Sequence, residues 1–102
     1  MEKTAIQIKD VDHVATAVVE FAPGETIVVS GVRGGQVVEV KERIPVGHKI
    51  AVRDIAADQE ILKYGEPIGV ATADIRAGHW VHVHNCRGVK ARRFGRRKEE
   101  QA

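Results

Sequence analysis

Residues 20–27 read EFAPGETI, residues 54–61 read DIAADQEI and residues 74–81 read DIRAGHWV. Each stretch runs from an acidic residue through an apolar one, a small residue or Arg, and a small residue to Gly or Asp, and after two variable positions it returns to an apolar residue. This pattern predicts a strand end, a tight turn and the start of a new strand. The spacings of 34 and 20 residues are unequal, which indicates a corner used three times rather than a solenoid repeat. Three such corners would bring distant strands together at one end of a sheet.

The segments between the corners predict short strands. These are residues 4–9, 12–22, 26–30, 36–40, 48–55, 60–64, 67–72 and 80–84. β-Branched residues dominate these segments, and such side chains pack well on a sheet but lose rotamer freedom in a helix. Turn residues recur about every ten positions, and no segment carries a sustained helical stripe. The pattern is typical of an all-β sandwich, barrel or clip-like fold.

The chain of 102 residues has the usual size of one domain. Cys86 is its single cysteine, so no intramolecular disulfide can form and nothing indicates secretion. The sequence shows neither a signal-peptide pattern nor the roughly 18 consecutive apolar residues of a membrane span. We therefore expect a cytoplasmic protein with no membrane association.

Charge divides the chain into two regions. Residues 1–86 hold nine Lys/Arg against twelve Asp/Glu, whereas residues 87–102 hold seven Lys/Arg against two Glu. We therefore predict a folded domain over 1–86 and a basic C-terminal tail over 87–102. Cations can displace counterions from phosphates, but the body lacks a base-reading helix, an aromatic array and a basic stripe. A solvated extension, or a tether to an acidic partner, is favoured over nucleic-acid binding.

A His-x-His pair is the sharpest chemical feature of the sequence. His82 and His84 lie two residues apart on a predicted strand, so both side chains should project from one face about 7 Å apart. Two neutral imidazoles could share a divalent metal, or one could bind while the other moves protons. Two ligands do not complete a metal site, however, and on the pattern alone two surface histidines are favoured.

Two further pairs are candidates for binding a ligand. Lys49 follows His48 at the start of a predicted strand, where the two could bind a carboxylate by charge-assisted hydrogen bonds. Lys63 and Tyr64 precede a glycine, and Tyr64 could donate to a hydroxyl-rich ligand or fill a small core. Taken alone, each pair fits an ordinary surface or packing role better.

Several motifs in one order resemble a known family. They are Gly47-His48-Lys49, Ile61-Leu62-Lys63-Tyr64-Gly65, Ile68-Gly69 and His82-Val83-His84-Asn85. Their order and spacing resemble the N-terminal SAF domain of the altronate/galactarate dehydratase (UxaA-type) family, a β-clip module. The resemblance covers roughly residues 4–86, more loosely in the first third. Cys86-Arg87-Gly88 and the basic tail match no motif of the family.

The resemblance implies a hydro-lyase that acts on sugar acids with a divalent metal, Fe²⁺ or Mn²⁺. It implies the small subunit of a two-chain enzyme that is inactive without a large catalytic dehydratase subunit, with homo-oligomers also possible. His82, His84 and His48 would be catalytic, and His82 and His84 would be metal ligands. The residues implied to bind substrate are Lys49, Lys63, Tyr64 and Asn85.

Two other functions stay open at this point. The small subunit of (2R)-sulfolactate sulfo-lyase has the same arrangement, and the motifs do not separate the two substrate classes. A β-clip module that binds carbohydrate or another ligand without catalysis is a further alternative, and an RNA- or DNA-associated adaptor that uses the basic tail is the least favoured one.

Overall fold

The computed structural model describes residues 3–31 and 36–88, and these residues form nine strands and no helix. The strands are β1 (Thr4–Ile6), β2 (Val14–Ala17), β3 (Thr26–Ser30), β4 (Gln36–Glu39), β5 (Lys49–Ala51), β6 (Glu60–Lys63), β7 (Glu66–Ala71), β8 (Trp80–Val81) and β9 (Cys86–Gly88). The all-β prediction is confirmed. Over these residues the structure offers no helical segment with the length and apolar character needed to cross a membrane.

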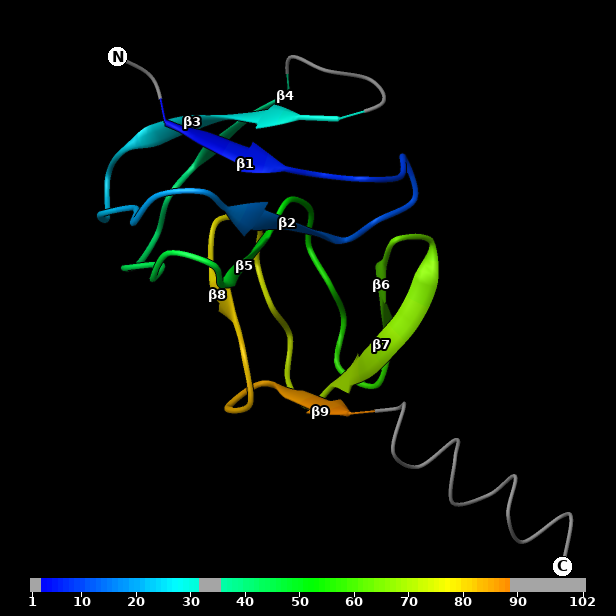
Figure 1. Ribbon diagram of the computed structural model, residues 1–102. Helices are drawn as coiled ribbons and strands as arrows, with labels where there is room; N and C mark the ends of the chain where they lie inside the picture. Colours follow the sequence, from blue (N-terminus) through cyan, green and yellow to red (C-terminus); the bar gives the residue numbers. More distant parts are fainter. Residues whose placement is uncertain (1–2, 32–35, 89–102) are drawn as a thin grey trace, which may run out of the picture.

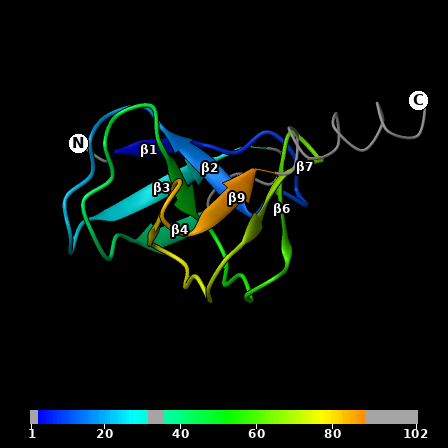
Figure 2. The same ribbon diagram turned by 90° about the horizontal axis from the view of Figure 1, so that it is seen from below.

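The strands form two curled sheets (Figure 1). The larger has the order β4-β3-β1-β2-β5-β8, and the smaller has the order β6-β7-β9. Neighbouring strands are antiparallel except β1 and β3, which run parallel. Seen from below, the β6–β7 hairpin lies to one side of strands β1 to β4 (Figure 2).

Most strands are shorter than the sequence predicts. β3 has the predicted bounds of 26–30, but the segment 12–22 holds only the four-residue β2. The predicted strand 80–84 ends at Val81, because the Asn85 side chain binds the backbone N–H of His82 and closes a turn. At the other end, β9 extends the folded domain to Gly88, beyond the boundary predicted at 86. Residues 89–102 of the predicted tail lie outside the described residues.

Tight corners of one design account for the short strands. In the described residues the design occurs at 22–25, 45–48, 56–59 and 76–79, where the fourth residue's N–H donates to the first residue's carbonyl. The third residue of each has positive φ: +89° at Gly24, +83° at Gly47, +71° at Asp58 and +94° at Gly78. Type II turns require this conformation at that place. The three corners predicted from sequence are present, and the corner at 45–48 is an additional one.

The corners are joined in pairs by the residue before each turn. Phe21 and Ile44 exchange two backbone hydrogen bonds of 2.9 and 3.0 Å, and Ile55 and Ile75 exchange two of 2.7 Å. All four side chains are buried. These bridges bring together chain segments that are about twenty residues apart.

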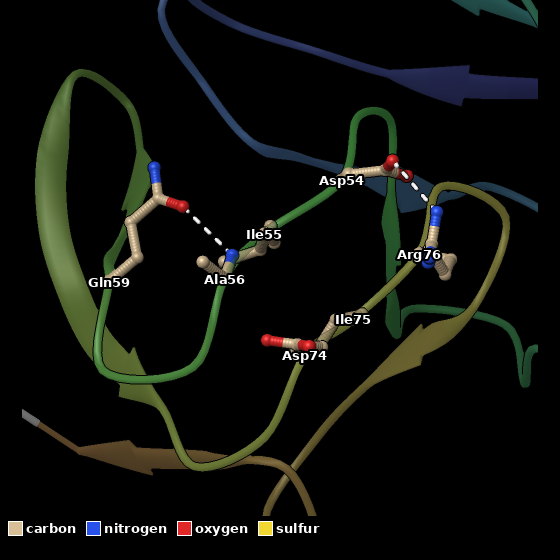
Figure 3. A pocket seen from close by; sticks show the side chains of 7 residues that line it. All are labelled: Asp54, Ile55, Ala56, Gln59, Asp74, Ile75 and Arg76. Carbon is tan, nitrogen blue, oxygen red and sulfur yellow. Dashed lines mark hydrogen bonds and ion pairs between the residues drawn. The ribbon is translucent and has the colours of Figure 1, made fainter.

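Carboxylates add a second link between the corners at 56–59 and 76–79. Asp54 Oδ1 accepts from the N–H of Ala77, and Asp74 Oδ1 accepts from the N–H of Ala57, each at 2.9 Å. A hollow of about 300 Å³ lies between the two corners (Figure 3). Its acidic side chains are therefore engaged in holding the corners together.

Two hydrophobic clusters form the core. The first packs against the larger sheet and contains Ala5, Ala15, Ala17, Phe21, Ile27, Val29, Val38, Val40, Ile44, Ile50 and Val52. The second lies between the sheets and contains Val14, Ala51, Ile55, Ile61, Ala71, Ile75 and Val81. Because neighbours on a strand face opposite sides, Ile50 and Ala51 of β5 serve different clusters.

His13 and Asp12 attach the β6–β7 hairpin to the larger sheet. His13 Nδ1 accepts from the backbone N–H of Leu62 at 2.9 Å, and the His13 N–H donates to the Leu62 carbonyl at 3.0 Å. The buried Asp12 carboxylate accepts from the N–H groups of Lys9, Tyr64 and Gly65. These bonds fix the hairpin turn beside the loop between β1 and β2.

The corner glycines should differ sharply in their tolerance of a side chain. A Cβ at position 78 would overlap the carbonyl oxygen of Glu39, whereas a Cβ at position 24 meets open space. We predict that Gly24→Ala lowers the free energy of unfolding by about 1–2 kcal/mol, the usual cost of this conformation. Gly78→Ala should cost roughly 3 kcal/mol or more, because the overlap adds to that cost. Urea denaturation measures both, and equal losses would contradict this account.

Stability should fall in acid through His13. Burial lowers the pKa of His13 below its ordinary value of 6.5, and Arg53 lowers it further, while Asp12 opposes the shift. As pH falls below 6.5 the unfolded chain takes up this proton first, so stability declines until the folded ring is also protonated. Urea midpoints between about pH 8 and 5 measure the decline. His13→Asn keeps an acceptor near Nδ1 at every pH, and its midpoint should depend less on pH; an unchanged slope would contradict the assignment.

Candidate functional site

Four aromatic side chains gather where the two sheets join. We call His48, Trp80, His82 and His84 the Trp80 cluster. Trp80 stacks on His82 with ring centres 5.3 Å apart and planes 7° apart, and it meets His84 at 5.0 Å. His48 lies 5.7 Å from Trp80 and 4.7 Å from His82. The structure thus brings the three predicted catalytic histidines together around an indole ring.

Three different elements position this cluster. His48 is the last residue of the corner at 45–48, and Trp80 begins β8. β5 and β8 pair antiparallel, with Ile50 opposite Trp80, which places His48 beside β8. His82 and His84 follow in the connection from β8 to β9, at the lower left of Figure 1.

The connection from 82 to 85 is a closed turn, so the prediction that His82 and His84 share one strand face is wrong. The His82 N–H donates to Asn85 Oδ1, and the Asn85 N–H donates to the His82 carbonyl, each at 3.0 Å. Asn85 Nδ2 also donates to the Trp80 carbonyl at 2.8 Å. The amide of Asn85, predicted to bind substrate, thus organises the turn. The two histidines meet through Trp80 instead of through strand geometry.

His82 and His84 line different hollows. His82 lines one of about 150 Å³ together with Lys49, Val83 and Cys86. His84 lines another of about 250 Å³, and the other residues around it are Glu42, Asp74, Ile75, Arg76, His79 and Asn85. Within residues 3–31 and 36–88, no three His, Cys, Asp or Glu side chains are grouped so that they could hold a metal. The metal that the resemblance implies therefore stays a prediction.

Glu42 is a site residue that the sequence analysis missed. Its Oε2 accepts from His79 Nδ1 and from the Trp80 N–H, each at 3.0 Å. Partial burial raises the pKa of Glu42, but these two hydrogen bonds outweigh it and hold the pKa below its ordinary value. Glu42 therefore ties the end of the corner at 76–79 and the start of β8 to the segment that follows β4. No local pattern marks this role, since Glu42 lies 37 residues before His79 in the chain.

The environment of His82 favours its neutral form. Desolvation lowers its pKa, and the positive charges of His48, Lys49 and His84 lower it further. Cys86 in the same hollow has its pKa raised by burial, although Lys49 opposes the shift. The hollow thus pairs a neutral imidazole with an ammonium group and a protonated thiol.

Lys63 and Tyr64 lie away from the Trp80 cluster. They form the turn of the β6–β7 hairpin, where Tyr64 has φ of +60° and its N–H is held by Asp12. The turn lies at the upper right of Figure 1, and the Lys63 ammonium sits 4.9 Å from the Tyr64 ring. β7 runs from this turn to Ala71, which pairs with Cys86, a path of about 17 Å at the usual rise of a strand. Neither residue lines the three hollows described here.

Comparison with known proteins identifies the fold. A family model described as the altronate/galactarate dehydratase SAF domain matches residues 3–89. The chain belongs to this SAF-domain family. The resemblance predicted from the motifs is confirmed.

Relatives of the SAF domain fall into two groups. It is 43% identical over 82 residues to the altronate dehydratase of Escherichia coli K12, covering 80% of this chain and 16% of that protein. It is 40% identical over 76 residues to that organism's galactarate dehydratase (L-threo-forming), covering 74% of this chain and 14% of that protein. It is 42% identical over 81 residues to (2R)-sulfolactate sulfo-lyase subunit alpha of Chromohalobacter salexigens, covering 67% of this chain and 83% of that subunit. The SAF domain therefore spans about one sixth of the dehydratases and most of the lyase subunit.

The charge of Lys49 should be measurable at His82. Removing it in Lys49→Gln takes away a charge that disfavours the protonated imidazole, so the pKa of His82 should rise toward its ordinary value. Titration of the His82 ring protons by NMR measures the change. Lys63→Gln removes a cation outside the cluster and should leave the pKa of His82 in place. An unshifted titration in Lys49→Gln would show that the ammonium does not face this ring.

Proposed function

We propose that this SAF domain is the small subunit of a metal-dependent sugar-acid dehydratase of the altronate/galactarate type. In this proposal a large catalytic subunit completes the site, and the isolated domain is inactive. The domain would act in the cytoplasm, since its single cysteine requires no oxidising compartment.

The observation that carries the proposal is the Trp80 cluster with Lys49 beside it. Three imidazoles lie around the ring of Trp80, and the ammonium group of Lys49 lines the same hollow as His82. The family membership and the names of the relatives point to lyases that act on acids. Cationic and neutral nitrogen groups are suited to bind a carboxylate and to move protons next to it.

Dehydration beside a carboxylate needs an anchor, a base and an acid. Lys49 would hold the substrate carboxylate by a charge-assisted hydrogen bond. His82 is suited to accept the proton next to that carboxylate, because its lowered pKa keeps the ring neutral near pH ~7. His84 would donate a proton to the departing hydroxyl. Lys63 and Tyr64 lie on the distant hairpin. In this proposal they would contact substrate only where the large subunit extends the site to that hairpin.

A divalent metal, Fe²⁺ or Mn²⁺, would supply stabilisation of the negative charge that develops on the substrate. Nitrogen ligands such as His82 or His84 suit such a metal. Because the two histidines line different hollows, we propose that only one of them contacts the metal. That histidine would then give up its proton-transfer role to a group of the large subunit, which would also supply the remaining ligands.

A sulfo-lyase subunit is the second candidate function. The support is length: the domain spans 83% of a relative named (2R)-sulfolactate sulfo-lyase subunit alpha, but only about a sixth of the dehydratases. The same anchor, base and acid would serve the loss of a sulfur group beside a carboxylate. Assays with both kinds of acid separate the two candidates.

We predict that the purified domain alone does not dehydrate altronate or galactarate, and that activity appears with the large subunit and Fe²⁺ or Mn²⁺. His84→Ala should lower kcat/KM of the assembled enzyme by about 100-fold, the usual scale for removing a proton-transferring group. Its urea midpoint should change little, because the His84 side chain is exposed.

Glu60→Gln is the matched control, since this exposed residue of β6 lines neither of the hollows beside the Trp80 cluster, and it should retain full activity. Rapid turnover by the isolated domain would refute the subunit proposal. Normal turnover of the His84→Ala complex would remove His84 from the site.

A further inference from the structure

We propose that Trp80 is a positioning residue that fixes His48 as a hydrogen-bond donor to a ligand carboxylate. The inference deepens the proposed function and rests on it for the nature of the ligand. It is carried by one contact, in which Trp80 Nε1 donates to His48 Nδ1 at 3.2 Å.

This contact determines where the proton of His48 lies. An indole N–H can only donate, so His48 Nδ1 must be the unprotonated acceptor. The neutral ring then carries its proton on Nε2. In the described residues no group accepts a hydrogen bond from His48 Nε2. His48 therefore presents a fixed N–H donor.

The corner at 45–48 departs from the others in a way that frees His48 for this role. In two other corners the fourth residue caps the first: Glu25 Oε1 accepts from the Ala22 N–H at 2.7 Å, and Gln59 Oε1 accepts from the Ala56 N–H at 2.9 Å. Here the first residue is Pro45, which has no N–H to cap. The His48 side chain is thus not needed to close the turn, and it reaches Trp80.

The surroundings of His48 fit an anion. Lys49 lines the hollow beside His82, and the ring of His82 lies 4.7 Å from the ring of His48. An ammonium group and an N–H donor on either side of one imidazole suit the oxygens of a carboxylate. Binding a metal through Nε2 would require the proton to move to Nδ1, where it would face the Trp80 N–H. The contact with Trp80 thus favours an oxygen ligand over a metal at this ring.

The first test is ¹⁵N NMR of the wild-type domain. We expect a ¹⁵N–¹⁵N coupling through the hydrogen bond between Trp80 Nε1 and His48 Nδ1, with the His48 proton on Nε2. Two histidines serve as internal standards. His13 Nδ1 accepts from Leu62 and must show the same protonation, whereas His79 Nδ1 donates to Glu42 and must show the opposite one. A proton on Nδ1 of His48 would overturn the proposal.

The second test uses galactarate as the probe and two matched variants. His48→Gln places an amide N–H near the position of Nε2, whereas His48→Asn places its amide near Nδ1. We expect His48→Gln to stay within about threefold of the wild-type Kd and His48→Asn to bind roughly tenfold more weakly, the scale of one lost hydrogen bond to a charged group. Equal losses in both variants, or no galactarate-dependent shift at His48 in the wild type, would overturn the ligand assignment.

Trp80→Phe tests the positioning role itself. The variant keeps a ring but removes the N–H, so the coupling disappears and galactarate binding should weaken as it does in His48→Asn. Trp80 also packs against the first core cluster, so a urea midpoint checks that the variant folds. If Trp80→Phe does not fold, the ¹⁵N–¹⁵N coupling in the wild type and the Kd values of His48→Gln and His48→Asn still test the proposal. Inactivity of the assembled enzyme alongside a positive coupling would remove the proposed function and leave the positioning by Trp80 intact.

Discussion

The fold depends on the reciprocal backbone bonds between paired corners. Phe21 with Ile44, and Ile55 with Ile75, each exchange two hydrogen bonds in places where the strands themselves have ended. Buried backbone groups must be paired, and strands of two to six residues cannot satisfy them all. The corners complete this pairing, and their positive-φ residues turn the chain back at once toward the core. A small domain with only Phe21, Tyr64 and Trp80 as Phe, Tyr or Trp residues in the described part of the chain thereby obtains two closed hydrophobic clusters.

The repetition of one corner makes its exceptions informative. Glu25 and Gln59 hold the same place in their corners and cap the same backbone group, which is a purely structural task. His48 and His79 hold that place in the other two corners, and their side chains turn outward to Trp80 and Glu42 instead. Departures from a local rule are expected where a protein builds a site. In this domain both exceptions involve Trp80, the first residue of β8, which donates to His48 and to Glu42.

The sequence was sufficient for the local features and insufficient for the ones that depend on distant partners. The strand at 26–30, three corners and the family resemblance follow from residues within short stretches of the chain. The Pro45-Val46-Gly47 turn follows from the sequence, but it was not grouped with the other three corners, because Arg43 replaces the acidic residue that marks them. The pairing of Glu42 with His79 was also missed, since neither residue carries a local signal for it. The strand predicted through His84 failed because period-two spacing cannot reveal that Asn85 will cap its own turn.

The placement of the cluster also explains how so small a domain can hold its imidazoles in place without a ligand. β8 is the last strand of the larger sheet and β9 the last strand of the smaller one, and only residues 82–85 connect them. Val81 is pinned opposite Lys49, and Cys86 opposite Ala71, so the short connection is fixed at both ends. Asn85 then closes it from within by three hydrogen bonds. A site held by its scaffold loses less conformational entropy when it binds. The rigidity of this turn therefore comes from the joining of two sheets, and the site is a consequence of the fold rather than an addition to it.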